Sequence, residues 1–345
     1  MKNHPHLKKN KAVTLAIVGC GAITETFYLP ALSQYPQVLE HLILVDNDIQ
    51  RAKKLADNFH LGKITADYNE IISSADGVIV AVPHHLHYRI AKSFLAQGVH
   101  VLCEKPLTET VAEARELVSL ADVNKVTLSV NLTRRLMPSS EKVKDLLNAG
   151  TIGKVQSITY LDGSEFNWPT ASGFYFDSKI STKGVLFDMG AHVLDLICWW
   201  LGGMPSVIKS ENDSFGGCEA VASLILDYHG ISVNVRLSRL SKLPNTYVIA
   251  GDRGSIEGMV YNGNYITLKS DKGSKTIKLT SDQSGMSGYA LRLVRNFIDV
   301  ILHGAHPLIP AQEALASIEL LTEAYEKKEN FLLPWYNVKA NSYAN

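Results

Sequence analysis

The sequence predicts an α/β protein with two domains, the first built on a doubly wound parallel sheet and the second on a mainly antiparallel sheet. A chain of 345 residues is long for one compact core and suits two domains of ordinary size. Between residues 12 and about 130, short apolar runs alternate with longer helical patterns, which is typical of βαβ units. Between residues 206 and 279, strand patterns are separated by turn signals, which is typical of antiparallel pairing.

The predicted strands of the first domain are nearly all apolar, as expected for strands that helices cover on both faces. They lie at residues 13–18, 41–46, 77–82, 99–104 and 126–130. Asp48 is suited to cap the helix that runs to Phe59, and a helix at residues 91–97 closes at Gly98. This alternation of strand and helix predicts a doubly wound sheet.

The pattern changes after Pro138, where the second domain is predicted to combine helices with its sheet. Helices are predicted at residues 141–148, 185–201, 288–302 and 312–327, and a strand at 155–160 precedes a long loop at 161–183. The predicted domains are therefore residues 12–131 and 132–345. The last helix, at about 311–328, is compatible with packing back on the first domain.

Composition excludes several classes of protein. Lys+Arg and Asp+Glu both total 34, so the formal net charge is +0, and no block of like charge favours nucleic acid or an anionic membrane as a partner. The 4 cysteines are scattered without a C-x-x-C pair, which is typical of reduced thiols. Neither a signal peptide nor a membrane span is predicted, so we expect a cytoplasmic protein.

A glycine-rich turn follows the first strand directly and leads into a helix. Gly19 permits a tight turn, and Gly21 lets the backbone approach a diphosphate at the amino terminus of the helix. A threonine stands where the third glycine of this motif is usual, which predicts a slightly larger distance between helix and strand. The predicted cofactor-binding residues of the turn are Gly19, Gly21, Ala22, Ile23 and Thr24.

The second predicted strand ends in Asp46, where an acid would accept hydrogen bonds from the ribose hydroxyls of a dinucleotide. The order of strand, turn, helix, strand and acid predicts a Rossmann domain that binds a dinucleotide. Asp46 would also repel a 2′-phosphate, and no arginine or lysine follows until Arg51. NAD is therefore predicted in preference to NADP.

Four further segments resemble the signature stretches of the Gfo/Idh/MocA oxidoreductases, a group that includes glucose-fructose oxidoreductase and inositol dehydrogenases. They are residues 81–87, 103–106, 134–138 and 184–195. The resemblance covers nearly the whole chain and implies a Rossmann domain followed by an α/β domain with a large open, mainly antiparallel sheet. It departs from the family at His84, where many members have Asn, and at Lys183, where many have Gly.

The resemblance also implies roles for individual residues. Lys105, Asp188 and His192 would face the nicotinamide and the substrate and form the catalytic set. Additional cofactor contacts are implied for Val82, Pro83, His87, Glu104 and Lys105. The open sheet would serve oligomer contacts, so a homodimer or homotetramer is expected.

The chemistry of the catalytic candidates fits these roles. Lys105 follows a strand at the carboxyl edge of the sheet, where its ammonium could stabilise an alkoxide. Asp188 and His192 are spaced i,i+4 on one helix face, with Asp195 on much the same face. Imidazole is suited to take the hydroxyl proton at neutral pH, while Asp188 positions the substrate. The alternative interpretation is a solvated lysine and a helix with ordinary side-chain contacts.

Two further residues are candidates for substrate contact. Arg135 and Trp168 suit phosphates and sugar faces, although Trp168 could equally pack under its loop. A metal is not expected at His84, His85 and His87, because adjacent side chains point apart and no acidic cluster accompanies them.

We therefore expect an NAD(P)-dependent oxidoreductase that transfers a hydride between nicotinamide and a hydroxyl or carbonyl carbon of a sugar, cyclitol or nucleotide sugar. One alternative is a redox-neutral enzyme that keeps its NAD tightly bound, for epimerisation or glycoside cleavage. Another is a regulatory protein that senses NAD without catalysis. The substrate and the direction of the reaction stay open.

Overall fold

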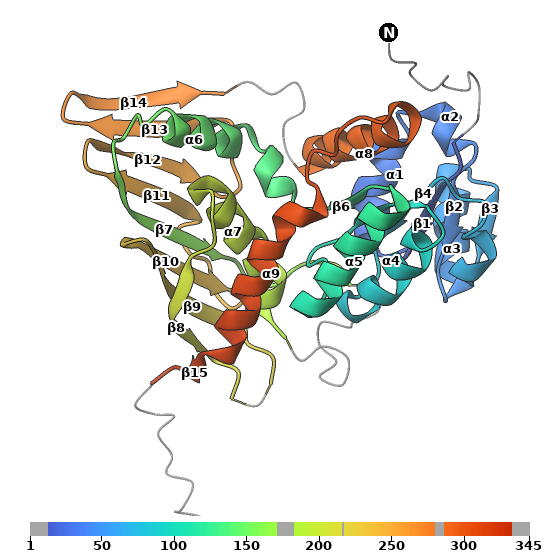
Figure 1. Ribbon diagram of the computed structural model, residues 1–345, viewed down its shortest axis with the longest axis horizontal. Coiled ribbons are helices and arrows are strands. Elements are labelled where there is room, and N and C mark those ends of the chain that lie inside the picture. The colour runs from blue at the N-terminus through green and yellow to red at the C-terminus, as the bar shows by residue number, and fades with distance from the viewer. Residues whose placement is uncertain (1–12, 171–182, 216, 280–285, 333–345) are drawn as a thin grey trace, which may run out of the picture. The chain divides into compact units, whose positions relative to one another are not determined.

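The structure is a computed structural model that describes residues 13–170, 183–215, 217–279 and 286–332 (Figure 1). The described residues form two compact units, each with its own sheet. The first unit contains the residues up to 136, residues 169–170 and residues 286–315, and the second contains the remainder.

The first unit is built on a 6-stranded sheet in the order β3-β2-β1-β4-β5-β6, in which every neighbouring pair is parallel. The strands are β1 (Leu15–Val18), β2 (Ile43–Val45), β3 (Lys63–Thr65), β4 (Gly77–Val80), β5 (His100–Cys103) and β6 (Leu128–Val130). The predicted doubly wound sheet is confirmed. The strand order reverses between β1 and β4, and open α/β sheets bind ligands beyond the carboxyl ends of strands at such a point.

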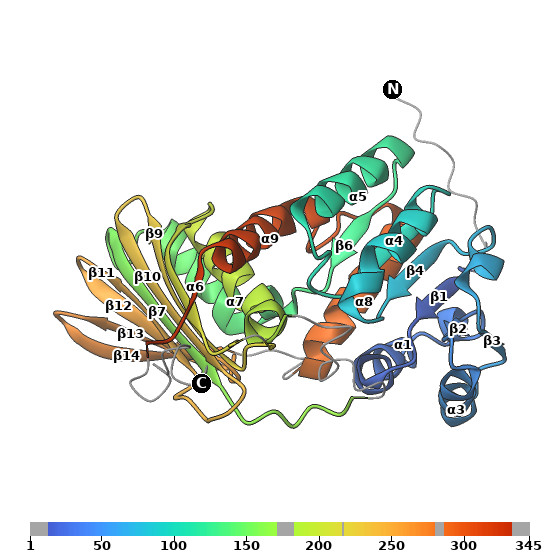
Figure 2. The same cartoon turned by 90° about the horizontal axis from the view of Figure 1, so that it is seen from below.

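Helices cover both faces of this sheet (Figure 2). The helical elements described in this unit are η1 (Thr24–Tyr28), α1 (Leu29–Leu32), α2 (Pro36–Leu39), α3 (Ile49–Phe59), η2 (Tyr68–Ile71), η3 (His84–Leu86), α4 (His87–Leu95), α5 (Val111–Asn124), η4 (Thr133–Leu136) and α8 (Met286–His303). The predicted cap of α3 is confirmed, because the Asp48 side chain accepts a hydrogen bond from the Gln50 amide at 3.2 Å. The predicted boundary grouped α8 with the second domain, whereas α8 packs against η1 and α1 of the first unit.

The second unit is built on a 9-stranded mixed sheet in the order β14-β13-β12-β11-β7-β10-β9-β8-β15. The strands are β7 (Val155–Gly163), β8 (Ser206–Asn212), β9 (Val221–Tyr228), β10 (Ile231–Ser238), β11 (Thr246–Gly251), β12 (Gly254–Met259), β13 (Tyr265–Ser270), β14 (Gly273–Lys278) and β15 (Lys328–Asn330). Only the β7–β10 and β8–β15 pairs among these strands are parallel, so the predicted antiparallel character is confirmed. His229 and Gly230 form the tight turn between β9 and β10 with positive φ of 52° and 86°.

Three helices accompany this sheet: α6 (Pro138–Asn148), α7 (Val185–Leu201) and α9 (Ala311–Glu326), of which α9 begins with residues of the first unit. Side chains alternate along β10, since Val233, Val235 and Leu237 are buried. The residues that alternate with them, Ser232, Asn234 and Arg236, are exposed. Among the described residues, the helices therefore pack on one face of the sheet, and the other, more polar face is exposed.

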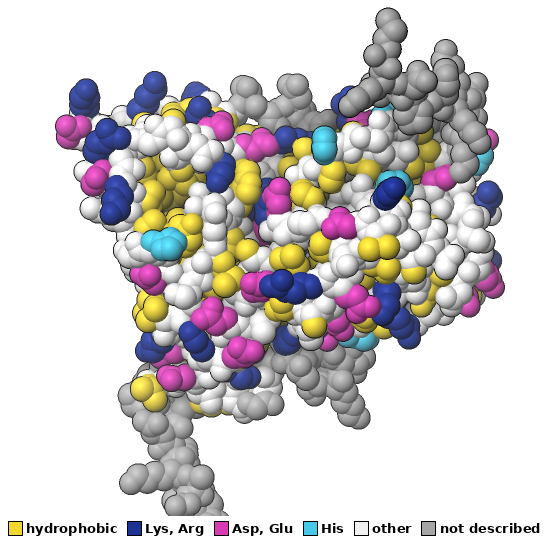
Figure 3. All heavy atoms as spheres, viewed as in Figure 1, with side chains coloured by type: hydrophobic (Ala, Val, Ile, Leu, Met, Phe, Trp, Pro, Cys, Tyr) yellow, Lys and Arg dark blue, Asp and Glu magenta, His cyan; other side chains and the backbone are white. Residues whose placement is uncertain are grey.

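The surface carries no dominant charge on the face shown in Figure 3, where basic and acidic side chains are interspersed. In the part of the chain that the structure describes, we find no helix with both the length and the apolar character that a membrane span requires.

Candidate functional site

The turn after β1 has the geometry that a diphosphate requires. Gly19 adopts φ 106°, and a Cβ at this position would lie 2.2 Å from the carbonyl oxygen of Ala81, so only glycine fits. A Cβ on Gly21 would meet nothing within 4 Å, so the backbone of this residue borders open space. The predicted strand, turn and helix are thus present, with room for a ligand at the second glycine.

Thr24 occupies the position at which the dinucleotide-binding motif usually has its third glycine. Its side chain is fully buried, and its hydroxyl donates a hydrogen bond to the Gly19 carbonyl at 2.6 Å. The helix is π-helical over Thr24–Tyr28, which makes this turn wider than an α-helix. The Thr24 side chain therefore connects the glycine turn to the helix by a hydrogen bond.

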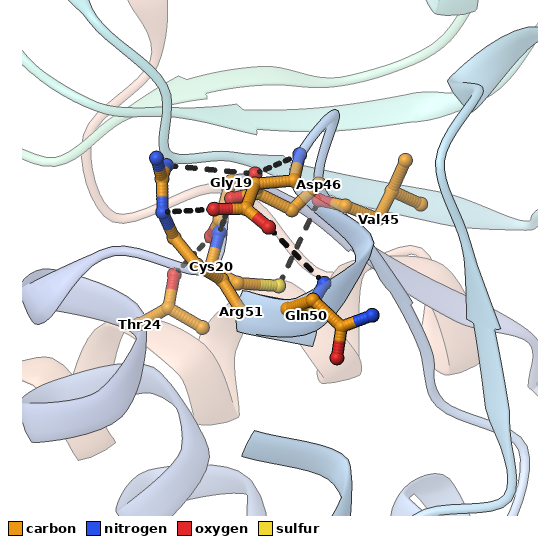
Figure 4. Close-up of polar contacts among 8 residues, drawn as sticks. Gly19, Cys20, Thr24, Val45, Asp46, Gln50 and Arg51 are labelled. Carbon is orange, nitrogen blue, oxygen red and sulfur yellow. Dashed lines mark hydrogen bonds and ion pairs between the residues drawn. The ribbon is translucent and has the colours of Figure 1, made fainter. Parts of the chain in front are cut away.

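Asp46 lies beside this turn, as the sequence predicts (Figure 4). One carboxylate oxygen accepts from the Cys20 amide at 2.8 Å and the other from the Asp48 amide at 2.9 Å. A carboxylate has about four acceptor positions, so two remain for the hydroxyls of a ribose. Burial raises the pKa of the Cys20 thiol to about 12, so this neighbour adds no charge.

His87 joins the loops that follow β4 and β5. Its ring is fully buried, with Nδ1 at 2.8 Å from the Pro106 carbonyl oxygen and Nε2 at 2.8 Å from that of Val82. Burial lowers the pKa of His87, and the two carbonyl groups oppose this shift. The neutral ring carries one N–H and donates to one of these carbonyls. His87 thereby links the backbone of Val82 to that of Pro106, and its predicted proximity to the cofactor stays a prediction.

Replacing His87 with glutamine is expected to weaken the dependence of stability on pH. The pKa of folded His87 lies below its ordinary value of 6.5, so the unfolded chain takes up this proton first as the pH falls. This contribution to stability is present above the unfolded pKa and is lost as the pH falls toward the lowered folded pKa. Urea titrations at about pH 7.5 and about pH 5 should show a smaller difference for His87→Gln. The exposed His303→Gln serves as control, and an equal pH difference in all three proteins would contradict the assignment.

Glu104 anchors the segment that carries Lys105. It is buried and accepts from the Tyr28 hydroxyl at 2.7 Å and the Asn131 amide at 2.5 Å, and its second oxygen accepts from the Lys105 backbone amide at 3.2 Å. Burial raises the pKa of Glu104, while the bonds from Tyr28 and Asn131 oppose this effect. Lys105 itself is half-buried between buried neighbours. Sequence reasoning missed Tyr28 and Asn131, although Asn131 follows a predicted strand at the same sheet edge.

Helix α7 carries Asp188 and His192, as predicted. Asp188 is 9 % exposed and forms an ion pair with Arg239 at 2.5 Å. The Arg239 guanidinium also lies over the Phe166 ring, 5.5 Å from its centroid. Sequence reasoning missed Arg239, which directly follows β10. Because Arg239 donates and Asp188 accepts hydrogen bonds, the pair offers both a donor and an acceptor to hydroxyl groups.

Glu219 organises the start of α7. One carboxylate oxygen accepts from the amides of Gly184 at 2.9 Å and Leu186 at 3.1 Å, and from the Tyr325 hydroxyl at 2.6 Å. The Glu219 carbonyl accepts from the Val185 amide at 2.8 Å. A carboxylate at a helix amino terminus satisfies amides that have no partner in the helix. Glu219 therefore acts as the cap of the helix that carries the predicted catalytic pair.

The two predicted substrate contacts have different surroundings. Arg135 is 4 % exposed, and its guanidinium is bonded to the carboxylate and the backbone carbonyl of Glu313. Trp168 is 37 % exposed. A role in substrate binding stays a prediction for both.

The predicted catalytic set is divided between the units, since Lys105 belongs to the first and Asp188 and His192 to the second. That they act in one site stays a prediction. Among the described residues, no group of His, Cys, Asp and Glu side chains gathers three members close enough to hold a metal ion.

Comparison with protein families matches both parts of the chain. Residues 13–132 match the model described as "Oxidoreductase family, NAD-binding Rossmann fold", and residues 140–257 match the model of the GFO/IDH/MocA C-terminal domain. An uncharacterized oxidoreductase of Synechocystis is 28% identical over 205 residues, which span 58% of this chain and 54% of that relative. Trans-1,2-dihydrobenzene-1,2-diol dehydrogenase of Xenopus tropicalis is 28% identical over 253 residues, 71% of this chain and 75% of the relative.

Solved structures share the fold. KijD10, a 3-ketoreductase from Actinomadura kijaniata in complex with NADP and TDP-benzene, has a TM-score of 0.81 at 20% identity and covers 94% of this chain and 100% of its own. A levoglucosan dehydrogenase in complex with NADH and levoglucosan has a TM-score of 0.79 at 19% identity and covers 91% of this chain and 96% of its own. At these identities the likeness concerns the fold.

Proposed function

Because the chain belongs to the Gfo/Idh/MocA family of oxidoreductases, we propose that it is an NAD(P)-dependent dehydrogenase or reductase acting on a CH–OH carbon of a sugar, cyclitol or nucleotide sugar. The observation that carries the proposal is the turn at Gly19 and Gly21 with Asp46 beside it, which has open space for a diphosphate and acceptors for a ribose. Two relatives, a trans-1,2-dihydrobenzene-1,2-diol dehydrogenase and a levoglucosan dehydrogenase, support a polyhydroxylated substrate.

The residues of the dinucleotide site would hold NAD(P), which supplies the hydride acceptor or donor for the substrate carbon. In the proposed mechanism, His192 takes the proton of the reacting hydroxyl and the Lys105 ammonium stabilises the oxygen that remains. Glu104 holds the backbone of Lys105, and Glu219 holds the start of the helix that presents His192. The Asp188–Arg239 pair would orient neighbouring hydroxyls of the substrate, Asp188 as acceptor and Arg239 as donor.

We propose NAD as the preferred cofactor. The acceptor positions left on Asp46 suit the hydroxyls of a ribose, and the negative charge of its carboxylate opposes a 2′-phosphate.

We further propose that the chain forms a homodimer or homotetramer through the open face of the second sheet. A row of residues on this face crosses the central strands, from Ile225 on β9 through Asn234 and Thr159 to Val248 on β11. Ile225 is 39 % exposed, so this polar face also offers apolar area to a second copy.

A substrate screen tests the proposed function. Purified protein would first be assayed for retained NAD(H) or NADP(H), and then mixed with polyols, cyclitols and nucleotide sugars in the presence of each cofactor. We expect nicotinamide absorbance to change with at least one polyhydroxylated compound. Retained cofactor without net turnover would favour a redox-neutral reaction, and failure to bind either dinucleotide would refute the proposal.

A further inference from the structure

We infer that Arg51 is the residue that sets discrimination between NAD and NADP, and that Asp48 controls it by competing for the Arg51 guanidinium. The inference rests on the proposed function, because it requires a dinucleotide at Asp46. It goes beyond the preference attributed to Asp46 alone, since it assigns the affinity for NADP to competition between Asp48 and the 2′-phosphate for the Arg51 guanidinium.

Arg51, in the first turn of α3, pairs with two carboxylates, those of Asp48 and Asp46; Figure 4 shows Arg51 beside Asp46. Its Nε is 3.1 Å from a carboxylate oxygen of Asp48, whereas its Nη1 is 3.6 Å from the nearer oxygen of Asp46. The first distance is that of a hydrogen-bonded ion pair, and the second exceeds the usual range of a hydrogen bond. Asp48 is therefore the partner that holds the guanidinium, and Asp46 only attracts it.

This arrangement leaves Asp46 available to a ribose. The amides of Cys20 and Asp48 use one acceptor position on each carboxylate oxygen, and Arg51 uses none of the remaining positions as a hydrogen-bond donor. A ribose with two free hydroxyls can therefore bind Asp46 while Arg51 stays on Asp48. We expect the affinity for NADH to depend little on Arg51.

A 2′-phosphate on the ribose would change the electrostatic interactions beside Asp46. It replaces a hydroxyl donor with an anion beside Asp46, which is 7 % exposed and keeps its charge close to the ligand. Arg51 is 35 % exposed and near the same carboxylate, so its guanidinium can turn and pair with the phosphate through two hydrogen bonds. Asp48 holds the guanidinium in its present orientation through Nε, so turning toward the phosphate weakens that bond. Asp48 and the phosphate thus compete for one cation.

Three variants test the inference through binding rather than turnover. Arg51→Gln removes the cation, Asp48→Asn removes the competing charge while keeping an oxygen that caps α3, and Lys53→Gln is a matched control. Lys53 is exposed on the same helix, so its replacement changes the net charge by the same amount as Arg51→Gln. Dissociation constants for NADH and NADPH would be measured by nicotinamide fluorescence at fixed ionic strength, with thermal melting to verify folding.

We expect Arg51→Gln to weaken NADPH binding by about tenfold or more and to change NADH binding by less than about threefold. Asp48→Asn should strengthen NADPH binding by about threefold or more with little effect on NADH, and Lys53→Gln should leave the ratio of the two constants unchanged. If both cofactors bind but Arg51→Gln leaves their ratio unchanged, or Asp48→Asn weakens NADPH binding, the inference is overturned. If the unaltered protein binds neither cofactor, the proposed function itself fails.

Discussion

Replacing His192 with alanine or Lys105 with methionine is expected to lower turnover by about 100-fold to 10,000-fold while cofactor binding is retained. A positioned acid or base accounts for factors of this size, because the proton must leave the hydroxyl as the hydride leaves its carbon. Methionine keeps much of the volume of lysine without its charge, so Lys105→Met removes the stabilisation of the oxygen with little change in packing.

The measurement is the steady-state rate with the substrate found in the screen, together with the dissociation constant for NADH. His303→Ala is the control for His192→Ala, because His303 is exposed at the end of α8. Retained NADH affinity would show that a loss of rate reflects chemistry and not unfolding. Turnover within a few-fold of the unaltered protein would rule out the corresponding residue as a member of the catalytic set.

The second large effect is expected at Gly184, which precedes α7. A Cβ there would lie 1.8 Å from the carbonyl oxygen and 2.7 Å from the amide nitrogen of Glu219. Backbone atoms cannot give way as a flexible side chain can, so Gly184→Ala must displace Glu219 and the bonds that it makes to the start of the helix. The combined cost of overpacking and a lost cap is about 3 kcal/mol or more.

Urea unfolding followed by tryptophan fluorescence would measure this cost, since Trp199 and Trp200 lie in α7 itself. Gly217→Ala is a suitable control in the same unit, because a Cβ there would lie 3.5 Å from the Ser214 carbonyl oxygen, an ordinary contact. Equal unfolding free energies for Gly184→Ala and Gly217→Ala would show that the segment at Glu219 adapts to the added methyl group.

Local sequence patterns predicted most of the first unit. Buried strands that are nearly all apolar, the glycine turn and the Asp48 cap are each encoded by neighbouring residues, and all appear in the structure. Strand β3 was missed because its residues, Lys63–Thr65, are largely exposed and lack an apolar run. As an edge strand it needs no such pattern.

The partners of the predicted site residues could not be read from local patterns. Arg239 and Asp188 are 51 residues apart, and Glu219 and Gly184 are 35 apart. Such pairs arise when separate strands and helices pack, so spacing along the chain carries no signal for them. The residues Lys105, Asp188 and His192 were singled out mainly by family resemblance, and their joint action stays a prediction.

The two outermost strands of the second sheet bear on how copies of this chain could associate. One edge strand is β14 (Gly273–Lys278), which includes Lys275 and Lys278. The other edge strand is β15, which consists of only the charged or polar residues Lys328–Asn330. Lysine-rich and very short borders discourage the addition of a further strand from another molecule. Both edge strands therefore disfavour the addition of strands from a second copy. Copies that associate through this sheet would pack face to face.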